Sequence, residues 1–135
     1  MLLDDCKVTI EAPTAAGTTT IDSAAYDCGG FDGICFAVRL GTPAANNNIR
    51  VQQSATSGGV YNDLQGSLVN SATLNQHMVE VYRPTKQFLR VRVTRGTSTT
   101  IDSVTVIQHW SRKRPVTQPA TAIFETWVGS PEGTA

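Results

Sequence analysis

The residues best suited to acid–base catalysis in this 135-residue chain are its two histidines. His77 and His109 each lie within or beside a predicted strand, and neither has a catalytic partner close by in the sequence. A Ser-His-Asp or Cys-His pair assembled in space stays open, because such groups meet only in the fold. The chain has no nucleophile-elbow motif. We therefore expect both histidines to be structural or surface residues, and we expect no enzymatic activity.

A glycine-rich acidic turn is the second candidate for chemistry. Asp27 and Asp32 flank Gly29, Gly30 and Gly33, an arrangement that could supply oxygen ligands to calcium. The spacing does not fit the alternating ligands and final glutamate of an EF-hand loop. No helix or Lys-Ser/Thr pair follows the two glycines, as a phosphate-binding loop requires. We expect turn-forming aspartates, with no metal and no cofactor.

Three cysteines form an odd set: Cys6, Cys28 and Cys35. Cys28 and Cys35 flank the glycine-rich turn and could approach each other, but nothing in the spacing demands a disulfide. A Cys-x-x-Cys pair and a nearby histidine are both missing, so the pattern does not predict a zinc site. The simplest interpretation is three buried free thiols in a reducing compartment.

The bulk composition predicts one domain that meets other macromolecules through a weakly charged surface. Charged residues make up 16% of the chain and the net charge is zero. Residues 1–65 carry a net charge of −4 and residues 66–135 a net charge of +4, an asymmetry that could steer docking or average out in one fold. The N-terminus has no basic segment or long apolar run, so we expect no signal peptide, no membrane span and synthesis in the cytoplasm.

Alternation of apolar and polar residues is the dominant pattern along the chain. The clearest run is Leu89–Arg95, which places Leu89, Val91 and Val93 on one side and polar side chains on the other. Such alternation is typical of a half-buried strand. Turn residues separate similar runs, and no amphipathic helix is evident. The predicted strands are 6–11, 36–40, 49–52, 78–82, 89–95 and 104–107.

These strands predict an all-β fold, an antiparallel, jelly-roll-like β-sandwich with extended terminal arms. Residues 1–110 form the predicted sandwich domain, and residues 111–135 form a predicted C-terminal extended arm with spaced prolines and apolar anchors. That arm could pack on a neighbouring subunit or fold back on its own sheet. Residues 1–5 could be a second arm, and residues 67–76 a loop.

Basic residues cluster in the second half of the chain, around one predicted strand and after the last one. An ordinary solvated strand face, a protein-binding face and a nucleic-acid groove are all open interpretations. The neutral overall charge argues against nucleic acid. The cluster consists of Arg83, Lys86, Arg90, Arg92, Arg95, Arg112, Lys113 and Arg114.

The order of several segments resembles a known family. Residues 49–54 read Ile-Arg-Val-Gln-Gln-Ser, and residues 84–90 read Pro-Thr-Lys-Gln-Phe-Leu-Arg. With the glycine-rich approach to the strand ending at Gly41 and the segments 60–66 and 79–84, residues 21–110 resemble the small cement, or head-decoration, proteins of tailed bacteriophages. The turn at 55–59 departs from the Asp-Gly turn common in that family, which leaves the hairpin type open.

The resemblance implies a structural virion protein that binds the outer surface of the capsid and stabilises contacts between major capsid protein subunits. Its expected partners are the major capsid protein and itself, as a homodimer or homotrimer, with no direct nucleic-acid contact. Alternatives are a receptor- or glycan-binding β-sandwich of the virion, or a neck or tail connector. We expect the protein interface to consist of Arg83, Arg90, Arg92, Arg112, Lys113 and Arg114, with Phe124 and Trp127 as apolar anchors.

Overall fold

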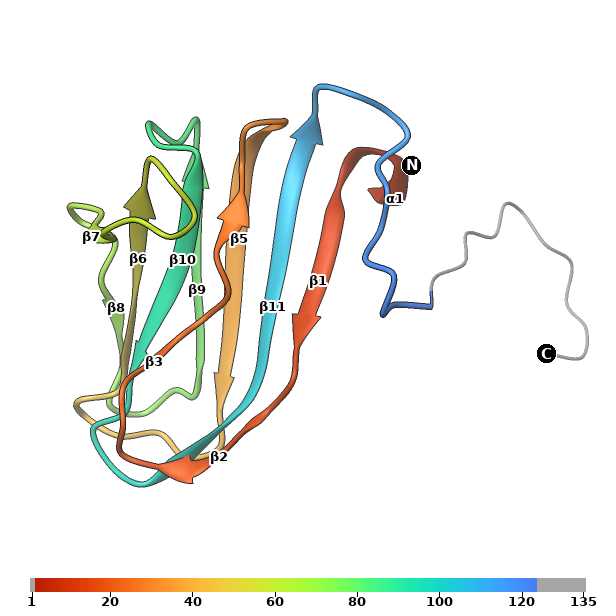
Figure 1. Cartoon of the computed structure of the whole chain (residues 1–135). Helices are drawn as coiled ribbons and strands as arrows, with labels where there is room; N and C mark the ends of the chain where they lie inside the picture. Colours follow the sequence, from red (N-terminus) through yellow and green to blue (C-terminus); the bar gives the residue numbers. More distant parts are fainter. Residues whose placement is uncertain (1, 124–135) are drawn as a thin grey trace, which may run out of the picture.

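Two antiparallel sheets pack face to face in the computed structural model, which describes residues 2–123 (Figure 1). This arrangement confirms the predicted all-β sandwich. A single turn of helix, α1 (Leu2–Asp5), precedes the strands. Sheet A contains β1 (Lys7–Glu11), β2 (Thr14–Gly17), β5 (Phe31–Leu40), β9 (Gln76–Tyr82) and β11 (Thr99–Ser111). Sheet B contains β3 (Ile21–Asp22), β4 (Tyr26–Asp27), β6 (Asn48–Ser54), β7 (Asn62–Asp63), β8 (Val69–Asn70) and β10 (Phe88–Thr94).

The strand order is that of a jelly roll. Sheet A runs β1-β11-β5-β9, with β2 continuing the edge beside β11; sheet B runs β3-β10-β6-β7, with β4 beside β10 and β8 beside β6. If each interrupted edge (β1 with β2, β3 with β4, β7 with β8) counts as one strand, consecutive strands alternate between the sheets. The one exception is the step from β6 to the β7–β8 edge, which stays in sheet B.

Two serines bridge the interruptions in the edges of sheet B. The Ser23 hydroxyl accepts a hydrogen bond from the Val91 N–H at 3.0 Å, and the Ser67 hydroxyl accepts one from the Val51 N–H at 3.0 Å. Val51 and Val91 face each other across β6 and β10 at the centre of the sheet. Each serine therefore replaces a missing strand residue, which keeps a buried backbone donor satisfied.

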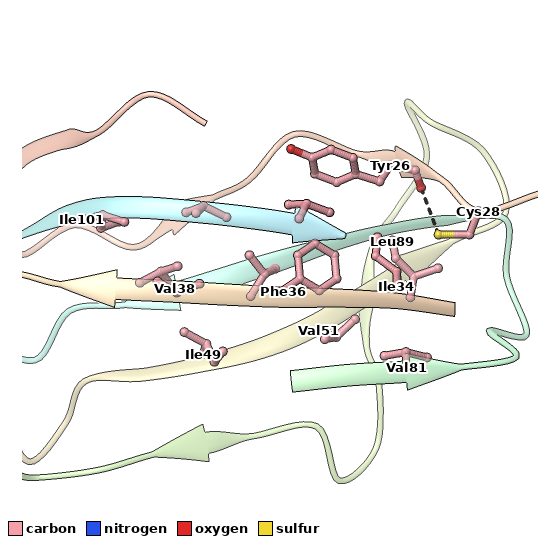
Figure 2. Packing of buried hydrophobic residues seen from close by; sticks show 14 of the residues in the cluster. Tyr26, Cys28, Ile34, Phe36, Val38, Ile49, Val51, Val81, Leu89 and Ile101 are labelled. Carbon is pink, nitrogen blue, oxygen red and sulfur yellow. Dashed lines mark hydrogen bonds between the residues drawn. The ribbon is translucent and has the colours of Figure 1, made fainter. Parts of the chain in front are cut away.

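The core lies between the two sheets and follows the alternation in the sequence. Leu89, Val91 and Val93 of β10 are essentially inaccessible, and Phe36 of β5 is the largest fully buried side chain (Figure 2). Tyr26 packs edge to face against Phe36, and its hydroxyl donates a hydrogen bond to Glu11 at 2.5 Å. Burial of these alternating apolar side chains is the main force that holds the sheets together.

A buried guanidinium ties the crossing between the sheets at the β2–β3 end of the sandwich. Arg95 is 5% exposed, and all its described partners are uncharged. It donates to the carbonyl oxygens of Ala15, Thr19 and Thr99, each at 2.8 Å, and to the Thr19 hydroxyl at 2.8 Å. Arg95 therefore belongs to the scaffold and not to the predicted basic surface.

Several boundaries differ from the prediction. β5 begins at Phe31, so Gly33 lies inside a strand and not in the predicted turn. A Cβ at Gly33 would lie 2.2 Å from His109 Cε1, because the imidazole crosses over this residue on the outer face. The predicted loop 67–76 contains β8 and the first residue of β9. The predicted N-terminal arm contains α1 instead, closed by the Cys6 N–H on the Leu2 carbonyl at 2.8 Å.

The first part of the predicted C-terminal arm folds back on its own chain. The Val116 N–H donates to the Asp4 carbonyl at 3.1 Å. The Gln118 side-chain amide donates to the carbonyl oxygens of Leu3 and Cys6 and accepts a hydrogen bond from the Val8 N–H. The structure describes this arm as far as Ile123. Residues 124–135, which include the predicted anchors Phe124 and Trp127, lie outside the described residues.

We predict that Arg95→Met lowers the free energy of unfolding by about 2–4 kcal/mol, because it removes the hydrogen bonds from a buried guanidinium to the carbonyl oxygens of Ala15, Thr19 and Thr99. Urea unfolding followed by circular dichroism measures this difference. Arg39→Met is the matched control, since Arg39 is exposed and its Nε lies 3.8 Å from Asp102; we expect a change below about 0.5 kcal/mol there. Equal losses in the two variants would contradict a structural role for Arg95.

Candidate protein-interaction surfaces

The outer face of sheet B carries a network of ion pairs within the chain. Arg92 donates to both carboxylate oxygens of Asp22, at 2.6 and 2.8 Å, and Arg90 Nη2 lies 3.0 Å from the same carboxylate. The Arg90 guanidinium also stacks over the Tyr61 ring, 4.2 Å from its centroid. These contacts occupy the two predicted interface arginines of β10 with partners from their own chain.

Neighbouring strands extend this network across the sheet. Arg90 Nε donates to Gln52 Oε1 at 2.9 Å, Gln52 Nε2 donates to Asp63 at 2.7 Å, and Arg50 Nε lies 3.2 Å from Asp63. We call the outer side chains Asp22, Arg50, Gln52, Asp63, Arg90 and Arg92 the charged face. The strand register places them side by side on the solvent side of sheet B.

The charged face shifts the acidity of its central carboxylate. The hydrogen bond from Arg92 is the main cause that lowers the pKa of Asp22 below its ordinary value, and burial opposes it. The pKa of Arg92 is raised by the same bond. Both shifts favour the charged forms, so the pair stays ionised over a wide pH range.

The other predicted interface cations lie elsewhere. Arg83 stacks over the Tyr82 ring at 5.2 Å, and Arg112 Nη2 lies 3.0 Å from Asp32. Arg114 Nε lies 2.5 Å from Asp5, and the exposed Lys113 follows the end of β11. Arg83 and Arg112 line one pocket together with Lys86 and Asp32, whereas Arg90 and Arg92 belong to the charged face.

The outer face of sheet A carries a group of apolar side chains, and the Glu80–His109 pair lies beside them on the same face. In antiparallel pairing, residues opposite each other point to the same side of the sheet. The register therefore aligns Val8 with Ile107 and Cys35, and Ile10 with Thr105, Ala37 and Met78. Ile10 is 70% exposed and Met78 is 66% exposed. We call the outer side chains Val8, Ile10, Cys35, Ala37, Met78, Tyr82, Thr105 and Ile107 the apolar face.

Exposed apolar side chains gathered on one sheet face indicate an interaction surface. Antiparallel sheets with one solvated face commonly place polar residues there. A contiguous exposed apolar area with polar surroundings is typical of a binding site. The sequence pattern missed this face because alternation separates two sides of a strand without saying which side is buried. Val8 and Ile10 in β1, and Met78 in β9, were the available signals.

One end of the apolar face carries aromatic side chains held by unusual backbone. Tyr82 and Trp110 pack edge to face with ring centroids 5.3 Å apart, and both are about half exposed. Trp110 and the neighbouring Arg83 have positive φ angles of 54° and 51°. Such conformations are uncommon outside glycine and often accompany functional sites.

The two histidines occupy different environments. His109 Nε2 lies 2.8 Å from Glu80 on the outer face of sheet A. His77 points into the sandwich, where burial lowers its pKa below the ordinary value and favours the neutral ring. Neither ring nitrogen of His77 has a hydrogen-bond partner within residues 2–123.

The structure has free thiols at Cys6, Cys28 and Cys35, although the sequence led us to expect all three to be buried. Cys6 and Cys28 are buried and Cys35 is half-buried. Burial is the main cause that raises the pKa of Cys28 to about 12, which keeps it protonated. Within the described part of the chain, no group of three or more His, Cys, Asp or Glu residues is placed to hold a metal ion.

The sequence matches no known family model and no curated protein at a significant level. In the described residues, no helix has the length and apolar character to cross a membrane.

We predict that Asp22→Asn destabilises the protein by about 1 kcal/mol at neutral pH, the upper range for a partly exposed ion pair. The pKa of Asp22 is lower in the folded state, so its stabilising effect is present above the unfolded value of about 4 and is lost as the pH falls through the folded value. The difference in the free energy of unfolding between Asp22→Asn and the unaltered protein should therefore shrink toward low pH.

Urea unfolding of both proteins between neutral pH and pH of about 2.5 measures this change. Asp102→Asn is the control, because Asp102 is exposed and its ion-pair distance to Arg39 is 3.8 Å. A deficit that is the same at all pH values would show that the Asp22 charge does not act as described.

Proposed function

We propose that this chain is a structural virion protein that binds the outer surface of a phage capsid and stabilises contacts between major capsid protein subunits. The observation that carries the proposal is the exposed apolar face of sheet A. A small sandwich with such a face suits a protein that is covered by a larger partner in its working state. The order of the strand segments, which resembles cement proteins, supports the same assignment.

The contrast between the two outer faces supports an oriented attachment. In the proposed complex, the apolar face meets the capsid and the charged face remains in water. Asp22 and Asp63 pair with three arginines and offset most of their positive charge, so the charged face is suited to hydration. This partial neutralisation also favours a protein partner over direct nucleic-acid contact, which relies on unneutralised basic side chains.

The proposed partners are the major capsid protein and further copies of this chain, as a homodimer or homotrimer. Capsid symmetry presents the same junction many times, so modest affinity at each copy gives a large collective effect. The proposed location is the capsid surface of the virion, after synthesis in the host cytoplasm.

A receptor- or glycan-binding module of the virion is the second candidate. Tyr82 and Trp110 favour it, because they present exposed ring surface beside Arg83 at the end of sheet A. Aromatic rings with an adjacent cation are suited to a ligand that has both apolar and polar groups. If the chain were a neck or tail connector, it would use the same kind of surface as in the proposed capsid-binding role.

We predict that Met78→Lys weakens binding to undecorated phage heads at least 30-fold, because burying an unpaired ammonium group opposes contact through the apolar face. Val60→Lys is the matched control: Val60 is 80% exposed and lies between β6 and β7, away from the apolar face. Co-sedimentation with heads measures affinity, and cryo-electron microscopy locates the bound chain.

Regular density on the shell, with binding lost in Met78→Lys and retained in Val60→Lys, is the expected result. Failure of the unaltered chain to bind heads would overturn the capsid proposal. Binding of the unaltered chain to a glycan on an array, together with loss of that binding in Trp110→Ala, would then favour the second candidate. Equal binding by both lysine variants would exclude the apolar face as the capsid contact.

A further inference from the structure

The edge strand β1 has a free side that is only partly occupied. β1 pairs with β11 on one side, and the Gln118 side chain binds the start of its other side. Gln118 Oε1 accepts from the Val8 N–H at 3.1 Å, and Gln118 Nε2 donates to the Cys6 carbonyl at 2.7 Å. One side-chain amide thus makes the two contacts that a neighbouring strand would make.

The remaining part of this edge is open to a strand. Backbone groups alternate in direction along an antiparallel pair, so Ile10 presents its N–H and carbonyl to the same side as Val8. The Ile10 N–H has no described hydrogen-bond partner on that side. Unpaired edges of this kind are templates for strand addition.

An apolar groove lies along the open edge. Leu3, Val8 and Ile10 form one wall, and Pro119, Ala122 and Ile123 form the other. Its volume is about 380 Å³. Ile123, the last described residue, stands at the lip of the groove and is 98% exposed.

We propose that residues 124–128 of a second copy of the chain add as a strand to the free edge of β1 and fill this groove. The segment reads Phe-Glu-Thr-Trp-Val, which is rich in residues that favour strands. Strand addition gives affinity through backbone hydrogen bonds, while side chains in pockets give specificity. Phe124 and Trp127 are three positions apart, so they fall on opposite sides of the added strand.

The geometry favours exchange between two copies over return of the same segment. A turn closed by the Ala122 N–H on the Pro119 carbonyl, at 3.0 Å, places residues 119–123 as the outer wall of the groove. The same chain would have to reverse again directly after Ile123 to enter between that wall and β1. A second copy enters without this reversal, and reciprocal exchange fills both grooves and closes a dimer.

The length of the remaining chain is sufficient for this exchange. Twelve residues follow Ile123, and an extended chain covers roughly 3.3 Å per residue. This reach exceeds the length of β1, which has five residues. The inference rests on the self-association included in the proposed function, and it does not require capsid binding.

We predict that the full chain sediments as a dimer without phage heads, and that deletion of residues 124–135 makes it a monomer. Ile10→Pro should also weaken dimerisation at least 100-fold. Proline removes the outward N–H that the added strand needs, and edge strands tolerate proline where the N–H faces solvent. Ile10→Val, which keeps the N–H and an apolar side chain, is the matched control and should remain a dimer.

A mixing experiment separates exchange from other forms of association. The truncated chain has a free groove and no segment, whereas Ile10→Pro has the segment and a blocked groove. A mixture of the two should form a one-to-one complex by sedimentation velocity, although each alone is monomeric. Circular dichroism and thermal unfolding confirm that both variants are folded.

A monomeric full chain, or a truncated chain that still dimerises, would overturn the exchange. So would the absence of a complex in the mixture of two folded variants. These outcomes are independent of head binding: a monomer that binds heads leaves the capsid proposal intact, and a dimer that ignores heads leaves the exchange intact.

Discussion

The crossing of the chain between the two sheets depends on one buried guanidinium. Arg95 holds the carbonyl oxygens of Ala15, Thr19 and Thr99, so it fixes both β2 and the segment that leads from sheet A to β3. At this crossing the chain leaves the sheet A edge formed by β1 and β2 and enters the sheet B edge formed by β3 and β4. The jelly-roll strand order requires this step. All the described partners of the Arg95 guanidinium are neutral acceptors, so its contribution to stability depends on where those acceptors lie. A lysine could not reach all of them, because it lacks the planar fork of donors.

Side chains also complete the sheets where strands are interrupted. Ser23 and Ser67 supply bonds to the central residues of sheet B, and Gln118 supplies two bonds to the edge of β1. These polar contacts keep buried backbone groups satisfied without long edge strands. Short, interrupted edges limit unwanted pairing with other chains. The open part of the β1 edge, next to an apolar groove, is where this protection is incomplete.

The two outer faces differ in their chemistry and are proposed to have different roles. On sheet B, Asp22 and Asp63 offset most of the positive charge of three arginines, and a hydrated surface results. On sheet A, the smaller side chains of Thr105 and Ala37 lie between the larger Ile10 and Met78, which leaves an apolar surface open to a partner. The proposed capsid contact and the proposed strand exchange overlap at Val8 and Ile10 of this sheet.

The sequence by itself determined the all-β class and the six main strands, because alternation of apolar and polar residues is a local property of a half-buried strand. Tertiary structure decided the rest. Arg90 and Arg92 of β10 meet Asp22, which is about seventy residues away, and such a pairing depends on register that no local pattern contains. In the same way, only the pairing of β1, β11, β5 and β9 in one sheet places Ile10 and Met78 on the same exposed face. Alternation separates the two sides of each strand, but the packing of the sheets decides which side is buried.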